Sequence, residues 1–100
     1  MSNLKINQDQ QNQLFFIKLQ NAQAYLKYDK PDDGILNLKA TYVPLDSRGK
    51  GIGSALAKYA LNYAKNKHCK VMPSCSFVSY YIENHPEFKE LTYTKANVTS

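Results

Sequence analysis

The residues best suited to chemistry in this chain are three closely spaced glycines that join an apolar stretch to an amphipathic one. Gly49, Gly51 and Gly53 are three of only four glycines in 100 residues. Glycine lets the backbone adopt positive φ and lets a ligand approach bare amides. Amides at the start of a helix point outward unpaired, and the helix dipole adds partial positive charge, so such places bind phosphate groups. Because Arg48 and Lys50 add two charges, the sequence predicts an anion-binding loop.

The spacing of the glycines separates this loop from two common phosphate-binding loops. It lacks the Gly-Lys-Ser/Thr ending of a Walker loop, and its G-x-G-x-G run differs from the G-x-G-x-x-G dinucleotide fingerprint. The pattern that it does contain is Arg/Gln-x-x-Gly-x-Gly/Ala, formed by Arg48, Gly51 and Gly53 and preceded by Val43-Pro44. The alternative for such a loop is a tight turn that binds no ligand.

Cys75 is the second candidate for chemistry. It comes just before a predicted helix over residues 76–84, and cysteines at helix N-termini are often reactive. The alternative is a small core residue, since free cysteine is often buried. We expect Cys69, at a predicted helix-to-strand junction, to pack against its neighbours. For His85, before Pro86, we expect a surface turn, with a general base as the alternative.

The elements that position these residues follow from the hydrophobic pattern. Three short apolar segments with short connections predict an antiparallel meander of strands over residues 14–19, 24–28 and 35–43. Apolar residues spaced by three and four predict a helix from about 51 to 67. The strand at 70–73 follows this helix, so a right-handed crossover places it parallel to the third strand. With the second helix, the expected fold class is α+β with a mixed sheet.

Finer expectations depend on single residues. Pro31 and Gly34 predict that the chain turns over residues 29–34. We expect one domain over residues 1–100, with 1–12 loose apart from a short edge strand near Leu4–Asn7, and 94–100 loose. Alternation in the third strand predicts one shared face for Leu36, Leu38, Ala40 and Tyr42. The apolar stripe of the first helix is expected to contain Ile52, Ala55, Leu56, Tyr59, Ala60, Tyr63 and Ala64.

The composition excludes several classes of protein. With 43% hydrophobic and 21% charged residues, the chain is typical of a folded globular protein. The net charge of +5 comes from dispersed lysines, and the single arginine argues against a sequence-specific nucleic-acid partner. The first five residues have no apolar h-region, so we expect no signal peptide, and no apolar run is long enough to span a membrane. We expect an intracellular, cytoplasmic protein with free thiols, and the Cys and His spacings predict no metal site.

Taken together, these motifs resemble the GNAT superfamily of N-acetyltransferases, from about Leu14 to Leu91. The resemblance is closest to the small YjdJ-type and NATD1-like N-acetyltransferase-domain proteins. It implies a truncated GNAT fold, because the chain before Leu14 is too short for the two N-terminal helices of a full-size domain. The motifs that match are Val43-Pro44, Arg48–Leu56, Val71–Val78, Tyr81-Ile82 and His85–Phe88.

The resemblance implies that the protein binds acetyl-CoA and transfers the acetyl group directly to a small amine, a polyamine or a lysine side chain. It implies that pantetheine lies where the strand ending near Val43 diverges from the strand at Val71. It also implies that Cys75 lies near the thioester and that Tyr81 protonates the departing thiolate. The residues implied for coenzyme binding are Val43, Arg48, Gly49, Lys50, Gly51, Ile52, Gly53 and Ser54.

One departure from the family pattern bears on catalysis. Relatives in the small group tend to have His-Thr-Glu before Val-Pro, whereas this chain has Ala40-Thr41-Tyr42. No strong base therefore remains on that strand, because tyrosine has a reference pKa near ~10. The alternative function is a non-catalytic domain of the same fold that binds CoA or a partner protein. An RNA-binding domain is disfavoured, because the aromatic residues alternate as in a core.

Overall fold

The computed structural model describes residues 5–93 of the chain as a five-stranded sheet with two α-helices and two short 3-10 helices. The strands lie in the sequence order β1-β2-β3-β4-β5 across the sheet. Their bounds are β1 Asn7–Asp9, β2 Leu14–Lys18, β3 Gln23–Asp32, β4 Ile35–Tyr42 and β5 Lys70–Pro73. The helices are η1 Leu45–Ser47, α1 Ile52–Asn66, α2 Ser76–Glu83 and η2 Pro86–Leu91.

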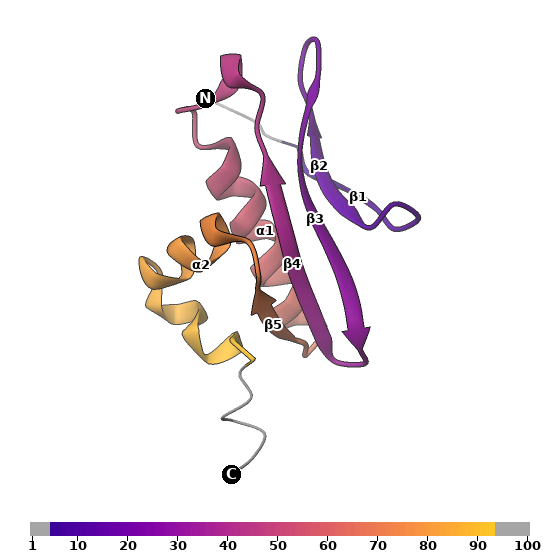
Figure 1. Cartoon of the computed structure of the whole chain (residues 1–100), viewed down its shortest axis with the longest axis vertical. Helices are drawn as coiled ribbons and strands as arrows, with labels where there is room; N and C mark the ends of the chain where they lie inside the picture. The colour runs from indigo at the N-terminus through magenta and orange to yellow at the C-terminus, as the bar shows by residue number, and fades with distance from the viewer. Residues whose placement is uncertain (1–4, 94–100) are drawn as a thin grey trace.

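The sheet is mixed, and this confirms the predicted fold class. Strands β1 to β4 pair antiparallel, whereas β5 pairs parallel with β4 after the crossover through α1. Figure 1 shows β3 and β4 as the long central pair, with the short β5 beside β4. The segment after η2 also joins this edge, because Thr92 forms a bridge with Val71. The order of strands, helix, strand and helix is the one that the sequence predicts.

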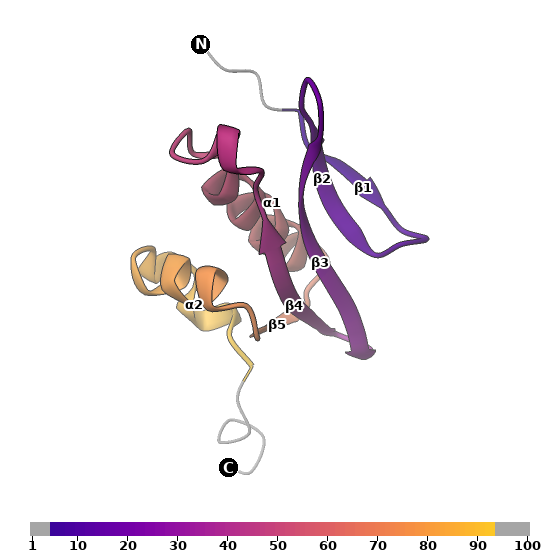
Figure 2. The ribbon, with the colours of Figure 1, turned by 45° about the horizontal axis from the view of Figure 1, so that its top comes forward.

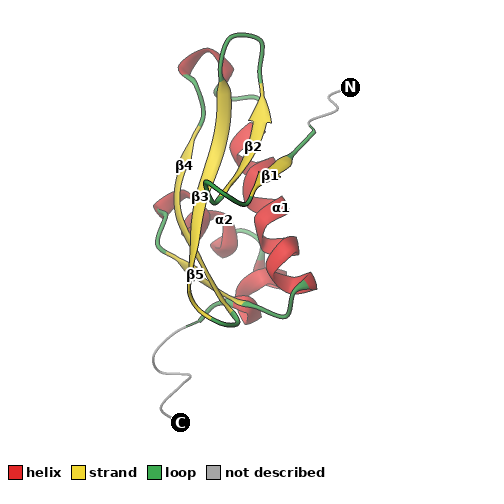
Figure 3. Cartoon of the chain, turned by 90° about the vertical axis from the view of Figure 1, so that its right-hand side faces the viewer, coloured by secondary structure: helices red, strands yellow, loops and turns green. Residues whose placement is uncertain are grey.

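The core lies between one face of the sheet and the helices, which Figures 2 and 3 show from two further directions. Alternate residues of β2 to β5 are fully buried on this face, including Phe15, Leu26, Leu38 and Val71. Their neighbours along the strands remain partly or fully exposed on the other face. In the described part of the chain, no helix has the length and hydropathy needed to cross a membrane.

The buried face of α1 is rotated from the predicted stripe. Residues spaced by four, such as Leu56 and Ala60, are buried as expected. However, Ala57 and Leu61 are also buried, while Tyr59 is 41% exposed. The tyrosine rings lie at the rim of the core, where Tyr59 and Tyr63 each contact Phe15 edge-on with centroids 5.6 and 5.3 Å apart.

Two expectations about the first half of the chain were wrong in their bounds. Strand β3 continues through Pro31 to Asp32, so the reversal is confined to Asp33 and Gly34. The pairing of β3 with β4 shifts register between Asp29 and Asp32, and a bulge of this kind is where a strand tolerates proline. The edge strand expected near Leu4–Asn7 lies later in the chain, as β1 at Asn7–Asp9. Part of the N-terminal segment is therefore paired with β2. Residues 94–100 lie outside the described residues.

A second bulge, at Lys39, decides which side chains of β4 face the core. Lys27 pairs with Ala40 and Tyr28 pairs with Leu38, so Lys39 has no partner of its own in β3. An extra residue reverses the alternation along the strand. Ala40 and Tyr42 are therefore exposed, contrary to the shared face expected from simple alternation, and Thr41 takes the inward position opposite Leu26.

Candidate coenzyme site

The candidate site is a cleft that opens where β4 and β5 diverge. The last parallel pair is Leu38 with Pro73, and beyond it the amide of Cys75 donates to the carbonyl of Leu38 at 2.9 Å. The chain then turns into α2, while β4 continues paired with β3 only. The resulting cleft has a volume of about 420 Å³. Its walls are formed by Thr41, Tyr42, Val43, Ser47, Arg48, Gly49, Gly51, Ile52, Gly53, Ser54 and Phe77.

The glycine loop forms one wall of this cleft because two of its glycines adopt left-handed backbone conformations. Gly49 has φ +80° and Gly51 has φ +79°, values that residues with a Cβ rarely adopt. Gly51 is the N-cap of α1, and its carbonyl accepts from the amide of Ala55 at 3.0 Å. A Cβ added at Gly49 or Gly51 would meet nothing within 4 Å, so both positions face open space. The cleft therefore has room for a group lying against these backbones.

The start of α1 offers hydrogen-bond donors to this space. Its first amides have no acceptor within the helix, and no side chain caps them. Ile52, Gly53 and Ser54 all line the cleft, so the unpaired end of the helix faces it. The helix dipole makes this end partially positive. The arrangement suits an anionic group with several acceptor oxygens, such as a pyrophosphate.

The charges around the cleft reinforce this preference for an anion. Arg48 is the charged side chain of the lining, which contains no carboxylate and no imidazole among the described residues. Its Nε donates to the carbonyl of Val43 at 2.9 Å, which ties the loop to the end of β4. Lys50 is exposed but does not line the cleft. Of the eight residues predicted to bind coenzyme, the other seven do.

Gly53 is needed for a different reason from the two glycines before it. A Cβ built on Gly53 would lie 3.1 Å from the ring of Phe77 and 3.7 Å from Val43. The absence of a side chain thus lets α1 pack closely against α2 and the end of β4. Phe77 is 36% exposed and forms the apolar wall of the cleft opposite the loop.

Cys75 lies at the bottom of the opening between β4 and β5. It is the N-cap of α2 and only 8% exposed, and its Sγ lies 3.3 Å from the Oγ1 of Thr41. Thr41 lines the cleft and Cys75 does not, so the thiol lies behind the hydroxyl of Thr41. Sequence reasoning missed Thr41, because its inward orientation depends on the bulge at Lys39. Cys69 is half-buried and its Sγ lies 3.7 Å from the carbonyl of Lys67, as expected for a packing residue.

Tyr81 does not line the cleft. It lies one turn after Phe77, and its ring stacks on His85 with centroids 3.9 Å apart. Burial of the phenol, together with the nearby carboxylate of Glu87, raises the pKa of Tyr81 above its usual value. Tyr81 therefore remains protonated through the neutral range. The Nδ1 of His85 donates to the carbonyl oxygen of Tyr81 at 2.8 Å and contributes to this packing.

The sequence and the fold were compared with known proteins. Residues 14–91 match the family model described as GCN5-related N-acetyl-transferase. The mouse protein NATD1 is 29% identical over 85 residues, which cover 83% of this chain and 77% of the relative. Human NATD1 is 28% identical, covering 83% of this chain and 75% of the relative.

A solved structure also has this fold. The solution structure of a GCN5-like protein from Staphylococcus aureus aligns with a TM-score of 0.69 and 28% identity. The alignment covers 93% of this chain and 91% of that one. The match to the family model spans every element from β2 to η2, including the glycine loop and the divergence of β4 from β5. The chain therefore belongs to the GCN5-related N-acetyl-transferase family.

Proposed function

We propose that the protein binds acetyl-CoA in the cleft between β4 and β5 and transfers the acetyl group to a primary amine. The observation that most supports this proposal is the wall formed by Gly49, Gly51 and the first turn of α1. Here bare backbone, unpaired amides and a positive helix end occur together beside the cleft. The pyrophosphate of the coenzyme is the group that this wall suits.

The residues around the cleft have separate roles in this proposal. The amides of Ile52, Gly53 and Ser54 bind the pyrophosphate, and Arg48 and Lys50 add positive charge around it. Val43 and Phe77 contact the apolar part of the pantetheine arm. Because five of these seven residues contribute backbone or apolar contacts, binding depends more on the shape of the loop than on any one charged side chain.

The pair of Thr41 and Cys75 is proposed to act on the thioester. The hydroxyl and thiol lie just beyond the point where β4 stops pairing with β5. The pantetheine arm ends at this point if the pyrophosphate lies at the start of α1. A donor at this place stabilises the negative charge that develops on the thioester oxygen as the amine attacks. The amine nitrogen forms a bond to the acetyl carbon and loses a proton to solvent, the carbon–sulfur bond breaks, and the thiolate takes up a proton. The family resemblance assigns the donation of that proton to Tyr81, whose ring lies outside the lining of the cleft, and the Tyr81→Phe variant tests this role.

The pH dependence of turnover tests whether an enzyme base takes part. No carboxylate or imidazole lines the cleft among the described residues, so the amine must lose its proton to solvent before it attacks. We expect the rate of CoA release, measured over a panel of primary amines, to rise with pH toward the pKa of each acceptor. A rate that levels off near pH ~6.5 for every amine would contradict this and would indicate a histidine, with His85 the first to replace.

A non-catalytic coenzyme-binding domain is the second candidate. Ala40 and Tyr42, which are exposed and stand where the small group that this chain resembles tends to have His and Glu, favour it. Acetyl-CoA binding without CoA release for any amine up to high pH would support this candidate over the enzyme.

A further inference from the structure

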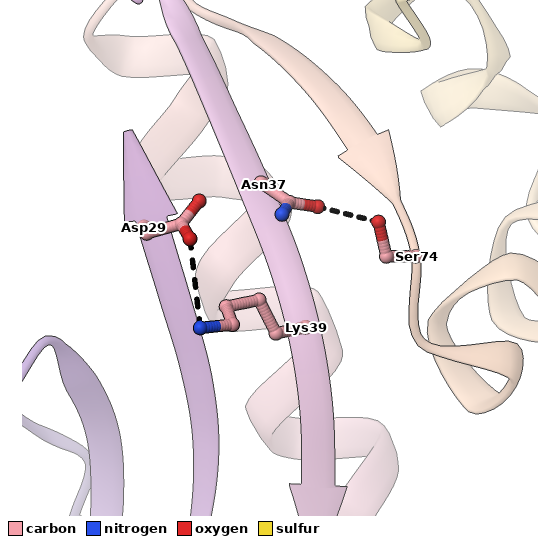
Figure 4. A network of polar contacts seen from close by, with 4 residues as sticks. All are labelled: Asp29, Asn37, Lys39 and Ser74. Atoms are coloured by element: carbon pink, nitrogen blue, oxygen red, sulfur yellow. Dashed lines mark hydrogen bonds and ion pairs between the residues drawn. The ribbon is translucent and has the colours of Figure 1, made fainter. Parts of the chain in front are cut away.

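A group of polar side chains lies on the face of the sheet that the helices leave open. Asp29 of β3, Asn37 and Lys39 of β4, and Ser74 just after β5 lie together there, as Figure 4 shows. The Nζ of Lys39 lies 3.5 Å from the Oδ2 of Asp29, and the Oγ of Ser74 donates to the Oδ1 of Asn37 at 2.6 Å. We call these four residues the open-face cluster.

The open-face cluster lies at the point where β4 and β5 part. Asn37 and Leu38 form the last two pairs with β5, Lys39 is the bulged residue directly beyond them, and Ser74 immediately precedes Cys75. Leu38, whose carbonyl accepts from the amide of Cys75, points to the opposite, buried side. The cluster is thus across the sheet from the thiol that is proposed to meet the thioester.

An acceptor amine can reach the place where β4 and β5 part from the open face of the sheet but not from the helix side. On the helix side Leu38, Leu56 and Val78 are fully buried, and the core is closed. On the open face the side chains of Lys39 and Asp29 remain 50% and 37% exposed. An amine arrives as an ammonium near neutral pH, and the coenzyme cleft has no carboxylate to receive it.

Asp29 has an unused hydrogen-bonding atom in this position. Its Oδ1 is buried and has no hydrogen-bond partner within the described residues. A buried carboxylate oxygen without a partner is uncommon, because its desolvation is then uncompensated. The other oxygen already faces the terminal ammonium of an unbranched alkyl chain, that of Lys39. The Oδ2 of Asp29 therefore has the geometry to receive an alkylammonium.

We propose that the open-face cluster is the acceptor subsite, and that Asp29 binds the ammonium of an unbranched primary alkylamine such as a lysine side chain. Lys39 occupies part of this subsite in the free protein and moves aside when the acceptor binds. A single carboxylate in a chain of net charge +5 favours one ammonium over the several of a polyamine. The inference rests on the proposed function, but amine binding can be measured without transfer.

A binding titration with two opposed variants tests the subsite. Nitrogen-15-labelled protein with saturating CoA is titrated with Nα-acetyl-L-lysine methylamide and followed by NMR. We expect the backbone amides of residues 29, 37, 39 and 74 to shift. Asp29→Asn should weaken binding about 10-fold, because it removes a charge-assisted bond. Lys39→Met should tighten binding by roughly 3-fold or more, because it removes the internal competitor. Lys27→Met, an exposed lysine on the same face that does not pair with Asp29, is the matched control and should change nothing.

The expected changes in amine affinity have opposite signs in Asp29→Asn and Lys39→Met, and this distinguishes a subsite from a structural ion pair. If the two residues only hold β3 to β4, both variants will weaken binding together or leave it unchanged, and the inference is wrong. Shifts confined to other amides would also overturn it. Failure of acetyl transfer with intact amine binding would contradict the proposed function and leave the subsite standing. Transfer to amines that persists in Asp29→Asn with an unchanged KM would contradict the subsite alone.

Discussion

Replacing Gly51 by valine is expected to weaken acetyl-CoA binding by roughly 100-fold or more, because several charge-assisted bonds to the pyrophosphate are lost together. The new side chain would project into the open space above Gly51, where the proposal places the phosphates. The change also forces valine into a left-handed conformation at φ +79°, which costs about 1–2 kcal/mol of folding free energy. Calorimetric titration gives the affinity, and thermal unfolding gives the stability.

Gly34→Val is a matched control for this experiment. Gly34 has φ +80° and also meets nothing within 4 Å, but it lies in the β3–β4 turn and outside the cleft. The two variants should lose a similar amount of stability, whereas only Gly51→Val should lose affinity. Equal affinities in the two folded variants would show that the coenzyme does not lie against this loop.

Replacing Cys75 by alanine is expected to lower turnover by about 10- to 100-fold while the Kd for acetyl-CoA changes by less than about 2-fold. The thiol is proposed to act with Thr41 on the reacting thioester and not on the distant pyrophosphate. Thr41→Val keeps the shape of the side chain but removes the hydroxyl 3.3 Å from Sγ, so it should give a similar loss. Initial rates of CoA release, measured with saturating acetyl-CoA, separate turnover from binding.

Cys69→Ala is the control, since this thiol packs at the other end of β5. Unchanged turnover in both Cys75→Ala and Thr41→Val would show that these two residues contribute only to core packing.

Tyr81→Phe, measured in the same assay, decides whether the buried phenol supplies the proton to the thiolate. Unchanged turnover in Tyr81→Phe would leave stacking on His85 as its role.

The loop and the helices could be predicted from the sequence because local chemistry determines them. Glycine is favoured where φ is positive, as at Gly49 and Gly51, and periodic apolar residues specify a helix whatever packs against it. The parallel placement of β5 follows from the handedness of crossovers. These local rules predicted the fold, and seven of the eight residues that the family resemblance implies for coenzyme binding line the cleft.

The bulges could not be predicted, because they depend on how β3 and β4 pair. A one-residue register shift at Lys39 reverses the faces of Ala40, Thr41 and Tyr42, and nothing in the sequence of β4 alone signals it. For the same reason Asp29 attracted no attention as a functional residue. It gained a candidate role only when the second bulge placed it beside Lys39 (Figure 4).

The most direct measurement of the central claim is a pair of calorimetric titrations of the parent protein, one with acetyl-CoA and one with S-acetylpantetheine. The second compound keeps the thioester and the pantetheine arm but lacks the pyrophosphate. If the glycine loop and the start of α1 bind that pyrophosphate, acetyl-CoA will bind at least about 100-fold more tightly, because the charge-assisted bonds to these amides are available to it alone. Equal affinities for the two compounds, or no heat of binding with acetyl-CoA, would contradict the account.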